Sequence, residues 1–175
     1  MQKLKIFLVL TGYQITWLAC VFGEIKFSYS FIGLYVGIIF FFIYFYFSQN
    51  KKKFLKITFL IAVPGYFFDT FMVYFQIYEF NTSVKFGTLP LWMIALWLSF
   101  STLFDEILYF FKKYRLFGII LSGMLGPLTY YLGEPIGVLN INNLNIFFIS
   151  MIFFWIFLMV YYLNFVINID KKLII

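Results

Sequence analysis

Length, composition and charge restrict the chain to one class of protein. It has 175 residues, of which 64% are hydrophobic, 26% aromatic and only 11% charged, with a net charge of +6. Soluble globular proteins carry charge on about a quarter of their residues, and disordered chains have low hydrophobicity, so both classes are excluded. The chain has no His and a single Cys, Cys20, which excludes a His-ligated metal, a thiolate metal cluster and an intramolecular disulfide. A small membrane protein with several spans remains.

Six apolar segments follow one another along the chain. They cover about residues 4–23, 28–47, 57–78, 91–111, 116–133 and 144–167. Each is close to the roughly 20 residues that a helix needs to cross about 30 Å of hydrocarbon, and continuous apolar runs favour helices over barrel strands. The sequence therefore predicts an all-α transmembrane helix bundle of six spans, forming a single domain over residues 1–175.

The positive charges predict how the spans are oriented. Six spans place both termini on one side, and 11 of the 13 Lys and Arg residues fall on that side. They are Lys3, Lys5, Lys51, Lys52, Lys53, Lys56, Lys112, Lys113, Arg115, Lys171 and Lys172. Because cytoplasmic loops are enriched in Lys and Arg, we expect cytoplasmic termini and an inner-membrane location. The charges lie between apolar runs and form no long stripe, so no nucleic-acid partner is expected.

The first two spans carry three features. Gln14 lies about eleven residues into the first span, near mid-depth, where its amide could bond Asp69 or simply join helices. Lys3 and Lys5 followed by Cys20 loosely resemble a lipoprotein signal, but we expect the span to be retained and Cys20 to be a small buried hydrophobe. In the second span, 33–37 has the GxxxG spacing, which allows two helices to approach closely.

Asp69 is the most informative polar residue of the sequence. It lies about twelve residues into the third span, where an ionised carboxylate costs several kcal/mol unless it is paired or hydrated. We therefore expect it to be neutral or to face a hydrated cavity; the alternatives are a functional group and a neutral acid that joins two helices. Pro64 and Gly65, one turn earlier, are expected to bend the helix, and Gln76 is expected on the Asp69 face.

The fourth span begins with Pro90, which suits a helix start, and carries Thr102 beside a polar face. Asp105 and Glu106 follow near the inner interface, where we expect them to pair with Lys112 or Lys113.

The fifth span is the least regular. Small residues recur every four positions and form a packing face. The ring of Pro127 would clash with the carbonyl of Gly123 in a regular helix, so the helix should kink or break there. Broken helices mark substrate sites in some transporters, and Thr129, Tyr130 and Glu134 could line a pocket that opens outward.

The expected ligand-binding residues are Gln14, Asp69, Thr102, Thr129 and Tyr130, near mid-depth on four helices. The expected helix-break and packing residues are Pro64, Gly65, Gly123, Gly126 and Pro127. No catalytic residue, metal or cofactor is expected.

Four blocks of the chain resemble a bacterial family of small multispan inner-membrane proteins known as domain of unknown function 2878. The blocks are Tyr13–Gln14 with 17–23; 65–69; 90–92 with 96–97 and Phe100; and Gly123, Gly126, Pro127, Tyr130, Gly133 and Gly137. The chain departs from the family pattern at Asp105, where Asn is common, and over 132–135, which argues against special roles for Asp105 and Glu134. The resemblance implies membrane location and architecture and no particular chemistry.

Three classes of function remain. We expect a membrane protein that binds or handles a lipid or small hydrophobic molecule at the polar site around Asp69. The alternative is a structural or assembly partner of a membrane complex, as a homo-oligomer or with another membrane protein, in which every polar group only joins helices. A small transporter or an intramembrane enzyme is less favoured, because no inverted repeat is visible and no His is present.

Overall fold

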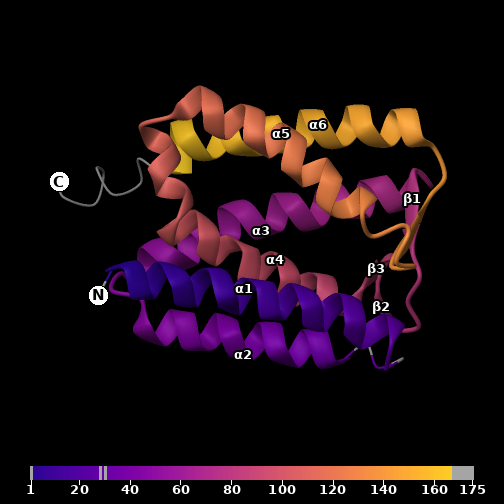
Figure 1. Ribbon diagram of the computed structural model, residues 1–175, viewed down its shortest axis with the longest axis horizontal. Coiled ribbons are helices and arrows are strands. Elements are labelled where there is room, and N and C mark those ends of the chain that lie inside the picture. The colour runs from indigo at the N-terminus through magenta and orange to yellow at the C-terminus, as the bar shows by residue number, and fades with distance from the viewer. Residues whose placement is uncertain (1, 28, 30, 167–175) are drawn as a thin grey trace. The chain divides into compact units, whose positions relative to one another are not determined.

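The computed structural model describes residues 2–27, 29 and 31–166, and helices dominate them (Figure 1). The α-helices are α1 (Gln2–Ile25), α2 (Phe31–Phe47), α3 (Lys51–Tyr74), α4 (Leu91–Glu106), α5 (Arg115–Tyr131) and α6 (Leu144–Tyr161). A 3₁₀ helix, η1 (Leu108–Lys112), and a π-helix, η2 (Tyr162–Val166), follow α4 and α6. The all-helical class is confirmed.

Three of the described helical segments are long and apolar enough to cross a membrane. They are Leu4–Ile25, Lys51–Tyr74 and Leu144–Val166, and Phe31–Phe47 is a shorter apolar helix. These segments support the prediction that the chain is a membrane protein. Ser28, Ile167 and the tail lysines Lys171 and Lys172, which belong to predicted spans or to the charge pattern, lie outside the described residues.

The third helix is shifted from the predicted 57–78. Its start lies earlier because the Asn50 side chain accepts the Lys53 N–H at 3.0 Å and so caps the first turn. Its end lies earlier because Gln76 adopts a left-handed backbone with φ of 55°. The Gln76 N–H donates to the Val73 carbonyl and the Ile77 N–H to the Met72 carbonyl, both at 3.0 Å. These two bonds form a Schellman motif, so Gln76 lies past the helix and leaves the predicted Asp69 face.

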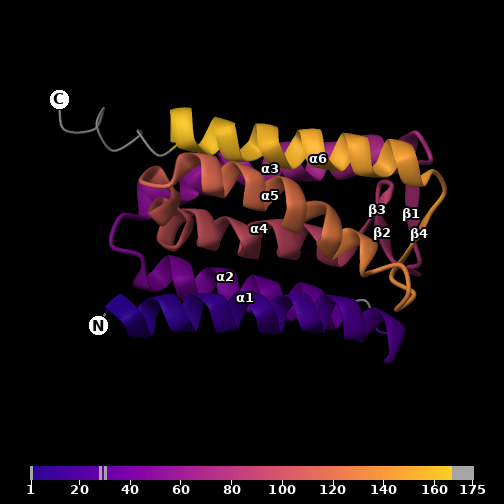
Figure 2. The same cartoon turned by 45° about the horizontal axis from the view of Figure 1, so that its top comes forward.

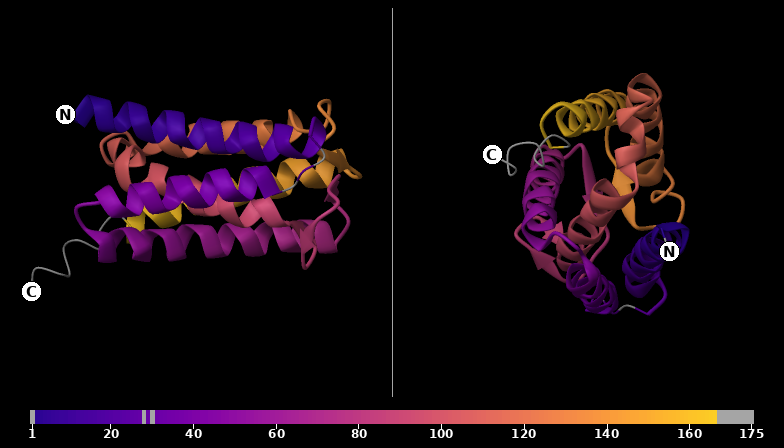
Figure 3. Two further views of the ribbon diagram at one scale, coloured as in Figure 1. Left: turned by 90° about the horizontal axis from the view of Figure 1, so that it is seen from below. Right: turned by 90° about the vertical axis from the view of Figure 1, so that its left-hand side faces the viewer.

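The chain divides into two compact units, and α3 passes from the first into the second. The first unit contains Met1–Phe67 and Thr82–Tyr109, and the second contains Phe68–Asn81 and Phe110–Ile175. In the first unit α1, α2 and α4 pack on one another, and α1 and α2 lie next to each other when seen along their axes (Figure 3).

The GxxxG pair of the second span serves this internal packing. A Cβ on Gly33 would lie 2.5 Å from the Cys20 Cα, and a Cβ on Gly37 would lie 2.8 Å from the Ala95 Cβ. Only glycine lets α2 approach α1 and α4 this closely.

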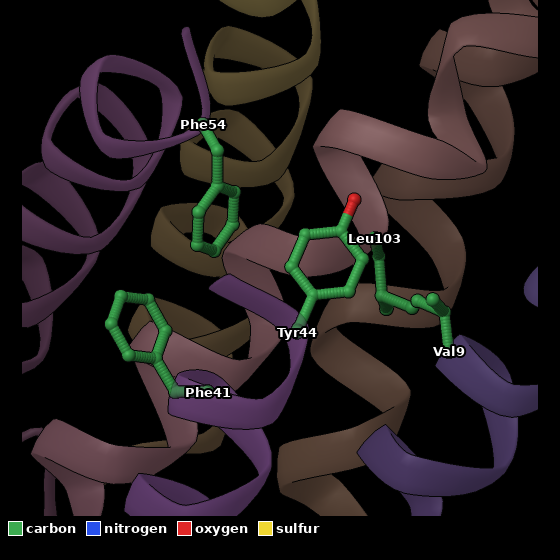
Figure 4. Close-up of a cluster of buried hydrophobic side chains, with 5 residues drawn as sticks. All are labelled: Val9, Phe41, Tyr44, Phe54 and Leu103. Carbon is green, nitrogen blue, oxygen red and sulfur yellow. The ribbon is translucent and has the colours of Figure 1, made fainter. Parts of the chain in front are cut away.

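A cluster of buried apolar side chains joins four helices of the first unit near its lysine-rich end. Figure 4 shows its members, contributed by α1, α2, α3 and α4: Val9, Phe41, Tyr44, Phe54 and Leu103. The Tyr44 ring packs against Phe54 at a centroid distance of 4.8 Å. Its hydroxyl points out of the cluster and donates to Asp105 and Glu106 at the end of α4. Polar side chains therefore border the apolar cluster on this side.

In the second unit α5 packs along α6 (Figures 1 and 2), and its small residues lie at the contact. A Cβ on Gly126 would lie 2.2 Å from the Trp155 Cγ, and the Ser122 hydroxyl donates to the Trp155 carbonyl at 3.2 Å. The helix does not break at Pro127 but continues to Tyr131. We attribute this to the close packing against α6, which holds the turn around Pro127 in place.

Short strands lie in two of the segments that connect the α-helices. In the second unit β1 (Tyr78–Phe80) pairs antiparallel with β4 (Leu139–Ile141). In the first unit β2 (Lys85–Phe86) and β3 (Leu89–Pro90) form a hairpin. Figure 2 shows both pairs. The sequence did not predict them because each strand has only two or three residues.

Candidate functional site around Asp69

Asp69 occupies a defined place on α3. It lies five residues before the last helical residue, Tyr74, which is about 7.5 Å along the helix axis. The predicted span placed it deeper, because the apolar run continues beyond the point where the helix ends. The carboxylate therefore lies closer to the strand-bearing end of its own unit than to the middle of α3.

Two tyrosine hydroxyls donate hydrogen bonds to the Asp69 carboxylate. Tyr78, from β1, donates to Oδ1 at 2.6 Å. Tyr130, from α5, lies 2.9 Å from Oδ1 and 3.0 Å from Oδ2, so its single hydrogen is shared between the two oxygens. Asp69 and Tyr78 are completely buried, whereas Tyr130 is half-buried. The carboxylate thus fastens α3, β1 and α5 of the second unit together.

The environment of Tyr78 keeps its hydroxyl a donor. Tyr78 follows the end of α3, outside the membrane-crossing helices. Burial raises the pKa of Tyr78 well above its ordinary value, and the charge of Asp69 raises it further. The hydroxyl therefore keeps its proton at neutral pH and continues to donate to the carboxylate.

Aromatic packing and the strand pair hold Tyr78 in position. Its ring lies 5.4 Å from the Phe80 ring, 5.9 Å from the Tyr130 ring and 6.0 Å from the Phe147 ring, between centroids. The β1–β4 register places Tyr78 opposite Ile141. Aromatic pairs at these distances contribute beyond their buried area, so they help to hold the donor in position.

A chain reversal after α3 brings Tyr78 back to Asp69. The Asn142 side chain donates to the Gln76 carbonyl and the Asn142 N–H to the Ile77 carbonyl, both at 3.0 Å. The Glu134 carboxylate accepts the Ile141 N–H at 3.0 Å. Glu134, which the sequence placed at the mouth of a pocket, thus holds β4 in register.

The structure brings together Asp69 and Tyr130 among the predicted ligand-binding residues. Thr129 is exposed, and its hydroxyl donates within α5 to the carbonyls of Leu125 and Gly126. Gln14 and Thr102 belong to the first unit. Gln14 is exposed on α1, and the buried Thr102 hydroxyl donates to the Ser99 carbonyl at 2.7 Å. The participation of Gln14, Thr102 and Thr129 in the site stays a prediction.

Pro64 and Gly65 leave α3 unbroken. A Cβ on Gly65 would lie 2.4 Å from the Trp97 Cζ3, so this glycine makes room for an indole ring of α4. Gly65 therefore allows α3 to pack closely against Trp97.

Asp105 and Glu106 form a cluster at one end of the first unit. Lys53 lies 3.6 Å from Asp105 and Lys5 lies 2.5 Å from Glu106. The Tyr44 hydroxyl lies 2.8 Å from Asp105 and 3.2 Å from Glu106. The acids are paired, as the sequence predicts, and these partners come from α1, α2 and α3. Sequence reasoning considered only Lys112 and Lys113, which follow the acids closely along the chain. Lys5, Tyr44 and Lys53 come from distant segments, so the sequence did not indicate them as partners.

Sequence reasoning missed two buried polar residues that join distant segments, Tyr78 and Glu24. Tyr78 appeared to be the last residue of an apolar span, and nothing in the pattern shows that the chain turns back. Glu24, at the end of α1, is 9% exposed, and its carboxylate accepts bonds from the Thr82 hydroxyl, the Ser83 N–H and the Trp92 indole. Only the depth of Glu24, next to the predicted end of a span, could have drawn attention to it.

Within the described part of the chain, no group of three or more His, Cys, Asp or Glu side chains is placed to hold a metal ion. The arrangement around Asp69 can accept hydrogen bonds from a hydroxyl or amino group in an apolar setting, which is a recognition chemistry.

Comparison with known proteins gives one result. A family model described as protein of unknown function (DUF2878) matches residues 6–161. No curated protein and no solved structure gives a significant match. The matched region includes the whole of the Asp69 site and nearly all of the six α-helices. The chain therefore belongs to this family of proteins of unknown function, as its four sequence blocks predict.

Proposed function

We propose that the protein is an integral protein of the inner membrane, with six spans and cytoplasmic termini, that binds a lipid or small hydrophobic molecule at the Asp69 site. The three long apolar helices support the membrane location, and the charge pattern of the sequence supports the orientation. Large side chains on α6 such as Phe153 and Phe157 are 71% and 63% exposed, as suits a helix in contact with lipid and not with water.

The buried carboxylate of Asp69 carries the proposal of a binding site. Ionisable groups within membrane helices are costly, and they mark functional sites by default. Both oxygens of Asp69 accept hydrogen bonds from tyrosine hydroxyls, so a ligand that takes the place of a tyrosine carries a hydroxyl or amino donor. Tyr130 is the more accessible of the two tyrosines, and its hydroxyl is the one that such a ligand replaces, while Tyr78 stays in place.

Asparagine substitution tests the need for a carboxylate. Asn keeps the size of the side chain but cannot ionise. We expect deletion of the protein to change the lipid profile of the cell. In the deletion strain, we expect Asp69→Asn to accumulate normally but not to restore the original profile. Asp105→Asn, the same change at the ion-paired acid of the first unit, is the matched control and should restore the profile. Full restoration by Asp69→Asn would refute the proposal.

The location is tested separately by cysteine labelling. Cys20 is buried, so Cys20→Ser provides a background for single cysteines at the exposed Lys52 and Lys85. We expect a membrane-impermeant maleimide to label Lys85→Cys in intact cells and Lys52→Cys only after the membrane is opened. Labelling of both residues from the same side would contradict the six-span orientation.

One observation favours the structural alternative. The Asp69 side chain is completely buried and bonded to two other segments of its own unit, as expected if it only joins them. The two functions differ in their response to Tyr130→Phe. In a binding site this change exposes an acceptor and alters ligand affinity more than stability, whereas a purely structural site loses stability alone.

A further inference from the structure

An apolar groove runs along the first unit between α3 and α4. Its volume is about 260 Å³, and its walls include Val63, Tyr66 and Phe67 of α3, Ile94 and Trp97 of α4, and Phe86 of β2. All of these residues belong to the first unit, so the groove is distinct from the Asp69 site.

Gly65 and Trp97 shape the groove. Trp97 is only 4% exposed, and its indole lies where a side chain on Gly65 would be, 2.4 Å from the position of a Cβ. The absence of a side chain at Gly65 therefore lets the indole lie against the α3 backbone. Any larger residue there would overlap the ring and displace it.

The β2–β3 hairpin is fixed beside the groove. The Tyr66 hydroxyl donates to the Phe86 carbonyl at 3.0 Å, which ties the hairpin to α3. The Glu24 carboxylate accepts bonds from Thr82 and Ser83 in the approach to the hairpin, which ties it to α1. The backbone at Phe86, whose ring lines the groove, is thus tied to both helices.

We propose that this groove binds one acyl chain of a membrane phospholipid. Pockets for drug-sized ligands measure about 300–1,000 Å³. The groove is smaller and its lining is apolar, so it suits a segment of one linear hydrocarbon chain. Phe59 and Phe67 on α3 are 65% and 59% exposed, so the groove is continuous with an apolar helix face. The proposal rests on the membrane location proposed above and does not depend on Asp69.

Tryptophan fluorescence in brominated lipid tests this proposal. Bromine on an acyl chain quenches an indole only at close range. Trp97 and Trp92 lie five residues apart on α4 and are almost equally buried, at 4% and 2% exposed, but only Trp97 lines the groove. The protein is reconstituted into vesicles of plain or chain-brominated phosphatidylcholine, and the contribution of each indole is the emission lost in Trp97→Phe or Trp92→Phe.

We expect bromination to quench Trp97 several-fold more strongly than Trp92. Ala62→Phe, which adds a ring to the groove wall, should remove the quenching of Trp97, whereas Leu55→Phe at an exposed position of α3 should not. Equal, weak quenching of Trp97 and Trp92 would overturn the proposal, whether the groove is empty or covered by a second copy of the chain.

The half-buried Trp17 on α1 separates this failure from failure of the membrane location. If Trp17 is quenched and Trp97 is not, only the acyl-chain site is wrong. If neither is quenched, the chain is not embedded in lipid, and both proposals are overturned.

Discussion

Removing the tyrosine donors from Asp69 should destabilise the protein by an amount that depends on how deeply each donor is buried. Tyr78→Phe takes a hydroxyl at 2.6 Å away from a completely buried carboxylate. Hydrogen bonds to charged groups contribute about 1.5–3 kcal/mol, so we expect a loss near the upper end of that range. Tyr130 is half-buried and shares one hydrogen between two oxygens, so Tyr130→Phe should cost about 1–2 kcal/mol.

A double-mutant cycle isolates these bonds from the rest of each side chain. The free energy of unfolding is measured in mixed micelles by titration with a denaturing detergent, for Tyr78→Phe, Asp69→Ala, which removes both acceptor oxygens, and the double variant. We expect a coupling energy of about 1–2 kcal/mol. Tyr74→Phe, at a 70% exposed position of α3, is the matched control and should change little. A coupling energy within about 0.3 kcal/mol of zero would show that Asp69 and Tyr78 do not interact, and the reasoning about the site would fail.

Three further predictions concern packing and the hairpin. Gly126→Ala should cost about 1–3 kcal/mol by overpacking, because the new Cβ would overlap the Trp155 ring; the same detergent titration measures it, and an unchanged midpoint would contradict the α5–α6 contact. Gly33→Ala should lower stability without changing the oligomeric state on size-exclusion chromatography, since Gly33 packs on the Cys20 backbone; a loss of oligomer with unchanged stability would instead assign Gly33 to an interface between chains. Glu24→Ala should speed proteolysis within 79–90 more than Glu24→Gln does, because Gln keeps an acceptor for the three donors, and equal rates would show that these bonds do not hold the loop.

The helices were predictable from sequence because a helix that crosses a membrane needs a long apolar segment, which is visible in the sequence. The starts and ends were less predictable. The third helix begins at Asn50's cap and ends at a left-handed Gln76, and a glutamine gives no local sign of the conformation that glycine favours. The turn is held by Asn142, which is 66 residues distant.

The same holds for the site: residues that stand out within their own segment were predicted, whereas contacts between distant segments were not. The sequence identified Asp69 and Tyr130 because a carboxylate and a polar ring stand out in apolar segments. It did not identify Tyr78, since Tyr78 reaches Asp69 only after the chain reverses and β1 pairs with β4. Gly65 was interpreted as a bend, whereas its contact with Trp97 depends on the rotation of two helices, which one sequence does not determine.

Identification of the lipids that co-purify with the protein tests the central claim most directly. Wild-type protein, Asp69→Asn and the control Asp105→Asn are extracted in the same mild detergent and examined by native mass spectrometry. A binding site at Asp69 predicts a retained molecule with a hydroxyl or amino group, which is lost from Asp69→Asn and kept by Asp105→Asn. Retention of the same molecule in the same amount by all three proteins would contradict it.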